Sequence, residues 1–217
     1  MIGGIAPFTT IDFPGRLAAV LFCQGCPWRC SYCHNPALLP FQPGRLGWEQ
    51  IRAFLLARRG LLEAVVFSGG EPLSQPALPA AMDEVRELGF AVGLHTTGAS
   101  PARFEQALAR ADWVGFDVKA PVDRYGEVTG HGAGAIVYRS LATLVSSGVA
   151  HEVRTTVDPQ QLGESDLLEM ARQLADAGVT HWVLQRCRGG GPRRIDPLED
   201  TSLIARLRTQ MPSLTVR

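Results

Sequence analysis

The chain has 217 residues, of which 46% are hydrophobic, so it can bury one substantial core and has little room for a second large domain. Its formal net charge is zero, which provides no long-range field to attract nucleic acid or anionic lipid. We therefore expect a single domain over residues 1–217, with neither a nucleic acid nor a membrane as partner.

The first residues have neither the basic start nor the long apolar run of a secretory signal, and no later apolar run is long enough to cross a membrane. We expect a protein of the cytoplasm. Short apolar runs predict strands at residues 17–24, 64–68, 90–94, 113–118, 151–157 and 181–186. Helical patterns in the intervals predict helices at 48–59, 75–88, 101–110, 137–147, 164–177 and 201–210.

Strands that alternate with helices are typical of parallel sheets with right-handed crossovers. Six strand–helix units are too few to close an eight-stranded barrel, so we predict an α/β fold of the open (β/α)6 partial-barrel type. In such folds the reacting groups gather at the carboxyl ends of the strands. The Gly- and Pro-rich segments 36–47 and 189–192, and the glycines at 130, 132 and 134, are predicted loops.

A compact cysteine motif, Cys26-Pro-Trp-Arg-Cys30-Ser-Tyr-Cys33, follows the first predicted strand. Its crowding does not fit a disulfide framework, whereas reduced thiolates bound to metal do fit. The C-x3-C-x2-C spacing lets one loop wrap a cubane iron–sulfur cluster. Three thiolates for four irons leave one iron open to a ligand, much as a catalytic zinc keeps one coordination position free.

The alternatives are a structural zinc site with His34 or Cys187 as fourth ligand, or a thiol cluster without metal. Zinc sites usually pair their ligands in two separated knuckles, and no second knuckle follows in the sequence. Cys23 is most simply a buried small apolar residue, and neither Cys23 nor Cys187 is assigned as a ligand. His34 is expected close to the cluster.

With Tyr32 in the aromatic position, the cysteine loop resembles the C-x3-C-x-aromatic-C hallmark of the radical S-adenosylmethionine (SAM) superfamily. The segments Ile11-Asp-Phe-Pro-Gly15, Val20-Leu-Phe-Cys-Gln-Gly25 and Tyr32-Cys-His-Asn-Pro36 further resemble the glycyl-radical-enzyme activases, especially the small anaerobic ribonucleotide reductase activating proteins. The resemblance covers nearly the whole chain.

This resemblance implies a [4Fe-4S] cluster on Cys26, Cys30 and Cys33, whose open iron is chelated by S-adenosylmethionine. Reductive cleavage of that cofactor gives methionine and a deoxyadenosyl radical. The radical would remove hydrogen from a backbone glycine of a partner glycyl-radical enzyme, with anaerobic ribonucleotide reductase the expected partner and reduced flavodoxin or ferredoxin the electron donor.

Two further motifs follow predicted strands. Ser68-Gly69-Gly70-Glu71-Pro72 resembles the GGE motif, which implies binding of the cofactor's ammonium; glycines allow close backbone approach to a ligand, and Glu71 or nearby carbonyls can accept from a cation. Read alone, the motif is only a turn. His95-Thr96-Thr97-Gly98 resembles the T-x-G segment of the activases, which makes Thr97 a cofactor-binding residue.

His95 departs from the activase pattern, in which an aspartate at this place helps to bind a monovalent cation. A lone histidine at a strand end is more often a structural residue than a ligand. Gln185 closes the sixth predicted strand, where contact with adenine and packing at the edge of the core are both open.

Asp117 and Lys119 lie two residues apart, so the alternation of a strand places them on one side. Every other cationic residue is arginine, which suggests a place where a compact ammonium is needed. In the family the matching pair lies beside the cofactor, so we expect Lys119 to offer charge to the cofactor's carboxylate or a nearby acidic group and to take part in catalysis. An ordinary surface ion pair is the alternative.

Arg154 lies on the inward side of the fifth predicted strand by the same parity. A buried arginine needs an anionic partner, which is either the cofactor or Asp117. The sequence offers no nucleophile–base pair for hydrolysis or acyl transfer. The competing functions are a radical enzyme acting on a small metabolite, such as a carboxy-deazaguanine synthase relative, and a non-catalytic iron–sulfur or zinc module.

Overall fold

The structure, a computed structural model, describes residues 1–187 and 196–217, so the predicted loop at 189–192 lies outside the described residues. The strands are β1 (Ile2–Thr9), β2 (Ala18–Cys23), β3 (Ala64–Gly69), β4 (Ala91–Thr96), β5 (Trp113–Asp117), β6 (Ala150–Val157), β7 (His181–Arg186) and β8 (Ser213–Val216). The α-helices are α1 (Trp48–Leu56), α2 (Leu78–Glu87), α3 (Pro101–Leu108), α4 (Tyr125–Thr129), α5 (Gly134–Ser147), α6 (Glu164–Asp176) and α7 (Thr201–Gln210).

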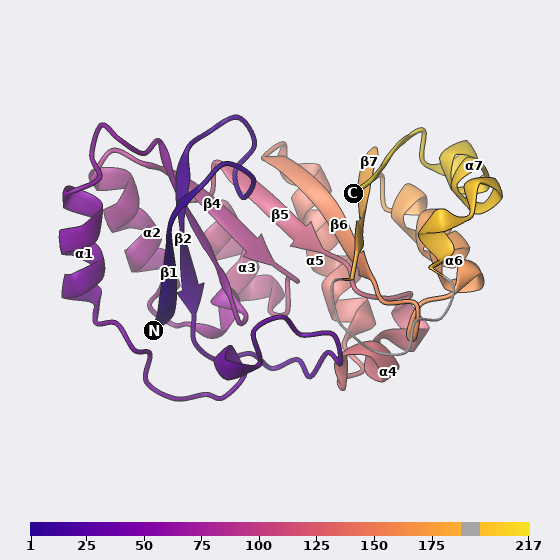
Figure 1. Cartoon of the computed structure of the whole chain (residues 1–217), viewed down its shortest axis with the longest axis horizontal. Helices are drawn as coiled ribbons and strands as arrows, with labels where there is room; N and C mark the ends of the chain where they lie inside the picture. Colours follow the sequence, from indigo (N-terminus) through magenta and orange to yellow (C-terminus); the bar gives the residue numbers. More distant parts are fainter. Residues whose placement is uncertain (188–195) are drawn as a thin grey trace.

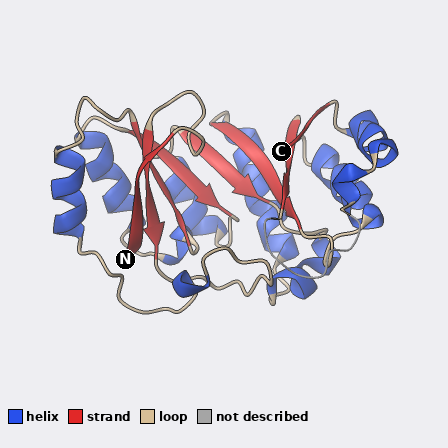
Figure 2. Ribbon diagram, viewed as in Figure 1, coloured by secondary structure: helices blue, strands red, loops and turns tan. Residues whose placement is uncertain are grey.

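One sheet holds the eight strands in chain order, with β1 antiparallel to β2 and each later strand parallel to the one before it. The helices follow the outside of the curved sheet (Figures 1 and 2). The predicted α/β fold is therefore confirmed, with the six strand–helix units running from β2 and α1 to β7 and α7. Among the described residues, no helix has the length and apolar character needed to cross a membrane.

The two edge strands were not predicted from the sequence. β1 contains two glycines and a proline, which weaken the strand signal, and β8 is only four residues long. The five-residue helix α4 was not predicted either, and Gly134 was predicted as loop although α5 begins there. Each missed element is short or rich in residues that are poor formers of its own structure.

Alternate residues of each strand face opposite sides of the sheet, and both sides are buried near β2. Ala19, Leu21 and Cys23 belong to the large core between sheet and helices. The inner side holds a smaller apolar cluster, which we call the lumen plug: Phe13, Ala18, Val20, Ala64, Val66 and Trp113. Cys23 is thus the buried apolar residue that the sequence predicted, and burial raises the pKa of its thiol to about 12.

Phe13 comes from the loop between β1 and β2 and is only 5% exposed. Its ring lies 5.7 Å from the ring of Trp113, at the start of β5. The lumen plug therefore fills the amino-terminal half of the sheet's inner side. Polar groups are left to the carboxyl ends of the strands.

Phe13→Ala would remove most of one face of this plug. We expect the free energy of unfolding to fall by about 3–5 kcal/mol, as for other large-to-small changes in a core. Phe8→Ala is the control, since Phe8 is 58% exposed on β1, and it should change that free energy by no more than about 0.5 kcal/mol. Urea unfolding curves measure the free energy of unfolding of both variants. A loss for Phe13→Ala as small as that expected for Phe8→Ala would show that the plug does not stabilise the fold.

Candidate active site

A cavity of about 210 Å³ lies at the carboxyl ends of the strands. Its wall includes almost every site residue predicted from the sequence: Cys26, Cys30, Tyr32, Cys33, Gly69, Gly70, Glu71, Thr97, Asp117, Lys119 and Arg154. A wider cavity of about 800 Å³ shares His34, Arg154 and Thr156 with it and also contains Gln185. The structure therefore brings the predicted residues together, with Gln185 in the adjoining space.

The loop that carries the three cysteines is fixed at several points by backbone hydrogen bonds. Gly25 N donates to Leu38 O at 2.8 Å, and Cys26 N donates to Leu39 O at 3.1 Å. Farther along, Arg29 N donates to Thr129 O at 2.7 Å, which ties the loop to the end of α4. The loop is thus held both to its own continuation and to the segment after β5.

Burial raises the pKa of the Cys26 thiol to about 12 and also raises the pKa of Cys30, so both are protonated as free thiols. A bound metal would displace these protons, because the thiolate is the ligand. In the described part of the chain, no three His, Cys, Asp or Glu side chains gather closely enough to hold one metal ion.

Gly69 and Gly70 are required by the chain's own backbone. Gly69 has a φ of 109°, and a Cβ there would lie 2.5 Å from Cys23 N. A Cβ at Gly70 would overlap the carbonyl oxygen of Gly25. Close approach to a ligand was the reason expected for these glycines. The structure gives a different physical reason, because they let the end of β3 pack against the start of the cysteine loop.

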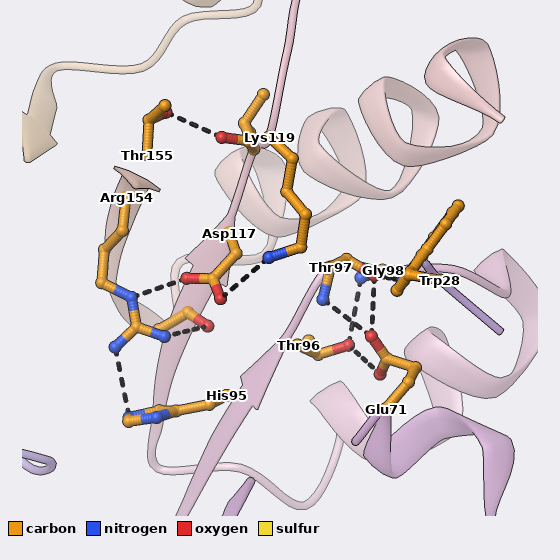
Figure 3. Close-up of polar contacts among 12 residues, drawn as sticks. Trp28, Glu71, His95, Thr96, Thr97, Gly98, Asp117, Lys119, Arg154 and Thr155 are labelled. Carbon is orange, nitrogen blue, oxygen red and sulfur yellow. Dashed lines mark hydrogen bonds and ion pairs between the residues drawn. The ribbon is translucent and has the colours of Figure 1, made fainter. Parts of the chain in front are cut away.

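Glu71 is 1% exposed, and both of its carboxylate oxygens are occupied (Figure 3). Oε1 accepts from Leu73 N at 3.1 Å and from Thr96 Oγ1 at 2.5 Å. Oε2 accepts from Thr97 N at 3.0 Å and Thr97 Oγ1 at 2.7 Å. A ligand's ammonium would therefore meet the neighbouring backbone carbonyls, which the sequence analysis also named, rather than a free carboxylate.

Trp28 is a site residue that sequence reasoning missed. Its indole Nε1 donates to Thr97 Oγ1 at 2.8 Å, so the middle of the cysteine loop is connected to Glu71 through Thr97. The ring is buried and meets Tyr125 edge-on at 6.0 Å. A tryptophan inside a cysteine loop was the available signal, because a buried indole needs a hydrogen-bond acceptor.

Asp117 lies between two cations (Figure 3). Arg154 Nε donates to Asp117 Oδ1 at 2.8 Å, and Lys119 Nζ lies 3.7 Å from Asp117 Oδ2. Burial would raise the pKa of Asp117, but Arg154 and then Lys119 hold it below its ordinary value. The ion pair with Asp117, one of the two partners considered for Arg154, is present in the structure.

Lys119 lies within ion-pair distance of Asp117. Burial opposes its positive charge, but the ionisable groups around it raise the pKa of Lys119 well above its ordinary value. The ammonium is therefore charged at neutral pH. A charged ammonium in a cavity wall can bind the carboxylate of a ligand.

Tyr32 carries the clearest sign of a missing partner. Its hydroxyl is buried and, among the described residues, is the one buried side-chain polar atom without a hydrogen bond. Burial also raises the pKa of this hydroxyl, so it is neutral. Buried polar groups are nearly always paired, and Tyr32 lines the cavity, so the site offers a ligand one hydrogen-bonding group that the protein leaves free.

The remaining predicted residues lie beside the site. Gln185 contacts Arg217, whose Nη2 lies 3.0 Å from the amide oxygen in the orientation that satisfies both groups. Cys187 lines neither cavity. Gly130, which was predicted to lie in a loop, ends α4 with a φ of 74° and so caps that helix.

His95 has the structural role that is usual for a lone histidine at a strand end. Its Nε2 lies 2.9 Å from the carbonyl oxygen of Asp12, and its ring meets Trp113 edge-on at 5.5 Å. Burial, and then the charge of Arg154, lower the pKa of His95 to about 3. The imidazole is therefore neutral and donates to the carbonyl, because a carbonyl can only accept.

Comparisons with known proteins indicate the family of the chain. The sequence profile of the radical SAM superfamily matches residues 20–174. The chain is 31% identical over 190 residues to a Methanocaldococcus jannaschii protein assigned as a glycyl-radical enzyme activating enzyme, which covers 82% of this chain and 77% of that protein. It is 35% identical over 138 residues to the pyruvate formate-lyase-activating enzyme of Clostridium pasteurianum, which covers 60% of this chain and 58% of that enzyme.

Among solved structures, Streptococcus suis SuiB bound to the precursor peptide SuiA superposes with a TM-score of 0.71, over 91% of this chain and 48% of that chain. The sequence identity is 11%, so this likeness is one of fold alone.

The low pKa of His95 predicts acid sensitivity. Unfolding returns His95 to a pKa near 6.5 from about 3, so between these values the unfolded state binds more protons. The contribution of His95 to the free energy of unfolding should therefore be at its maximum above pH 6.5. As the pH is lowered from 6.5 towards 3, the free energy of unfolding should decrease by up to about 1.4 kcal/mol per pH unit. His95→Gln should flatten that slope, and His181→Gln, at an exposed position, should not. Urea unfolding at a series of pH values tests this, and parallel slopes for wild type and His95→Gln would contradict it.

Proposed function

This chain belongs to the radical SAM superfamily, and we propose that it activates a glycyl-radical enzyme by removing a hydrogen atom from a backbone glycine of that partner. Membership of this family implies an iron–sulfur cluster and S-adenosylmethionine. The reaction with a glycyl-radical enzyme is supported by the activase relatives, of which one is 31% identical over 82% of this chain. We assign the whole chain, residues 1–217, to one radical SAM domain.

The observation that carries the proposal is that Cys26, Cys30 and Cys33 line one cavity together with Lys119 and Tyr32. Among the described residues, this wall contains three cysteine thiols and lacks a fourth. This number of thiols fits a [4Fe-4S] cluster in which one iron is left open. When bound, the cluster and S-adenosylmethionine supply the electron and the adenosyl group with which a hydrogen atom is removed. The protein's own residues then bind, orient and enclose these groups.

Each wall of the cavity has a separate task in this proposal. Lys119 binds the cofactor's carboxylate, and the backbone carbonyls near Gly69 and Gly70 accept from its ammonium. Glu71 and Trp28 hold the cysteine loop in place from behind. The lumen plug fills the opposite end of the sheet's inner side, so in this proposal ligands enter from the carboxyl ends of the strands.

The partner, the electron donor and the location are finer parts of the proposal. The motif resemblance favours anaerobic ribonucleotide reductase as the protein substrate. Reduced flavodoxin or ferredoxin would supply the electron, and the reaction would take place in the cytoplasm.

The decisive experiment mixes the reconstituted protein anaerobically with S-adenosylmethionine, a reductant and an anaerobic ribonucleotide reductase. We expect a glycyl-radical signal by electron paramagnetic resonance, with one deoxyadenosine formed for each radical. Cys33→Ala should abolish both products, because it removes a thiolate ligand. Cys187→Ala is the matched control, since Cys187 lines neither cavity, and it should retain both.

Deoxyadenosine without any protein radical, for every glycyl-radical enzyme tried, would reject activation and favour a small-metabolite substrate. Activity in Cys33→Ala would reject the assigned ligands.

Lys119→Met should weaken binding of S-adenosylmethionine by roughly 10- to 100-fold, because a hydrogen bond to a charged group contributes about 1.5–3 kcal/mol. Isothermal titration of the cluster-loaded protein measures the affinity. Lys119→Arg retains the charge but replaces the compact ammonium with a planar fork, so it should not restore full affinity. Wild-type affinity in Lys119→Met would show that the ammonium does not bind the cofactor.

A further inference from the structure

We infer that Arg154 is the permanent counter-cation of Asp117 and that, by occupying this carboxylate, it leaves the Lys119 ammonium free for the carboxylate of S-adenosylmethionine. Arg154 is then a positioning residue rather than a residue that touches the cofactor. This inference rests on the proposed function, because it concerns how the same site receives its anionic ligand.

The guanidinium of Arg154 is aligned with Asp117 by the sheet itself. Arg154 on β6 is the register partner of Asp117 at the end of β5. The side chain reaches back across β5, with Nε 2.8 Å from Asp117 Oδ1 and Nη2 3.4 Å from the carbonyl oxygen of Gly115. Arg154 is only 7% exposed, so its charge is held in one place.

The guanidinium occupies the space that a side chain at position 115 would fill, and we call this space over Gly115 the seat of the guanidinium. A Cβ at Gly115 would lie 2.7 Å from Arg154 Cζ, 2.8 Å from Nη1 and 2.9 Å from Nη2. Three atoms at nearly equal distances show that the guanidinium lies flat over the glycine. The backbone of Gly115 is not in the left-handed region, so the absence of a side chain serves the guanidinium and not the backbone.

Among the described residues, the ion-pair partners of Asp117 are Arg154 and Lys119. His95 lies 3.4 Å from Arg154 Nη1, but its Nε2 hydrogen is donated to the Asp12 carbonyl and the ring is neutral. Two cations therefore share one carboxylate, so Asp117, Lys119 and Arg154 together carry one net positive charge.

The two cations do not share Asp117 equally. The contact from Arg154 is a full hydrogen bond, whereas the 3.7 Å from Lys119 Nζ exceeds hydrogen-bond length. An ammonium has three donors, and this one is not committed to Asp117. Without the guanidinium, Asp117 would be the nearest anion for Lys119, and the two would neutralise each other.

The test is chemical rescue of Arg154→Ala. In the cluster-loaded variant we expect affinity for S-adenosylmethionine to fall by roughly tenfold or more, which is about 1.4 kcal/mol. Millimolar methylguanidinium should restore the affinity, because it refills the space with a cation. N-methylurea fills similar space without charge and should not. Wild type should respond to neither compound, and Arg110→Ala, which removes an arginine paired with Asp83 between α3 and α2, should bind as wild type does.

A second readout does not depend on the cofactor. Arg154 helps to lower the pKa of His95, so removal of Arg154 should raise that pKa. The titration of His95 should then move toward neutral pH, where nuclear magnetic resonance spectra of the cluster-loaded protein, without S-adenosylmethionine, can follow it. Methylguanidinium should lower the pKa again, and N-methylurea should not. His95→Gln assigns the resonance.

Gly115→Ala is a second variant that keeps the arginine but removes its seat. It should weaken binding of S-adenosylmethionine and raise the pKa of His95, as Arg154→Ala does. Gly93→Ala is its matched control: a Cβ there would meet Val66 and Phe13 rather than a cation, so stability should fall while the affinity stays as in wild type.

Wild-type affinity in both Arg154→Ala and Gly115→Ala, or equal rescue by N-methylurea and methylguanidinium, would overturn the inference. Failure of the wild type itself to bind S-adenosylmethionine would instead overturn the proposed function. The His95 titration would still report in that case whether the guanidinium occupies its seat.

Discussion

The buried carboxylate of Glu71 connects the parts from which the site is made. It accepts hydrogen bonds from the hydroxyls of Thr96 and Thr97 at the end of β4. The Thr97 hydroxyl in turn accepts a hydrogen bond from the Trp28 indole in the cysteine loop. A carboxylate removed from water needs hydrogen-bond donors, so Glu71 holds the loops after β2, β3 and β4 together. The cavity is shaped by this requirement before any ligand binds.

The inner side of the sheet has an apolar layer and a polar layer, and chemistry can occur in the polar one. The lumen plug is apolar and lies toward the amino ends of the strands, with Phe13 brought in by the β1–β2 loop. Above it lie His95, Asp117 and Arg154, which satisfy one another or nearby carbonyls. The thiols and the Lys119 ammonium line the cavity beyond them. Polarity thus rises toward the carboxyl ends, where ligands can enter.

The sequence predicted most of this arrangement because strand parity is a strong rule. Spacing placed Asp117 and Lys119 on one side of their strand and Arg154 on the inward side of the next, and all three line the cavity. Contacts between distant segments were beyond its reach. Nothing local shows that Trp28 bonds to Thr97, 69 residues away, or that Gly115 is glycine because of an arginine from the next strand. Glycine has many possible causes, and only the fold shows which one applies.

The solitary lysine of the chain now has a physical explanation. At Gly115 the seat is flat and faces a carboxylate, which suits a planar guanidinium with donors along its edge. At the cavity wall the cation must remain compact and uncommitted, which suits an ammonium. Lys119 also opposes the effect of burial on the pKa of Cys30, so the same charge favours the thiolate of the cysteine loop. Exchanging the two cations would give Asp117 a poorer partner and put a larger cation into the cavity, so the positions of Arg154 and Lys119 are not interchangeable.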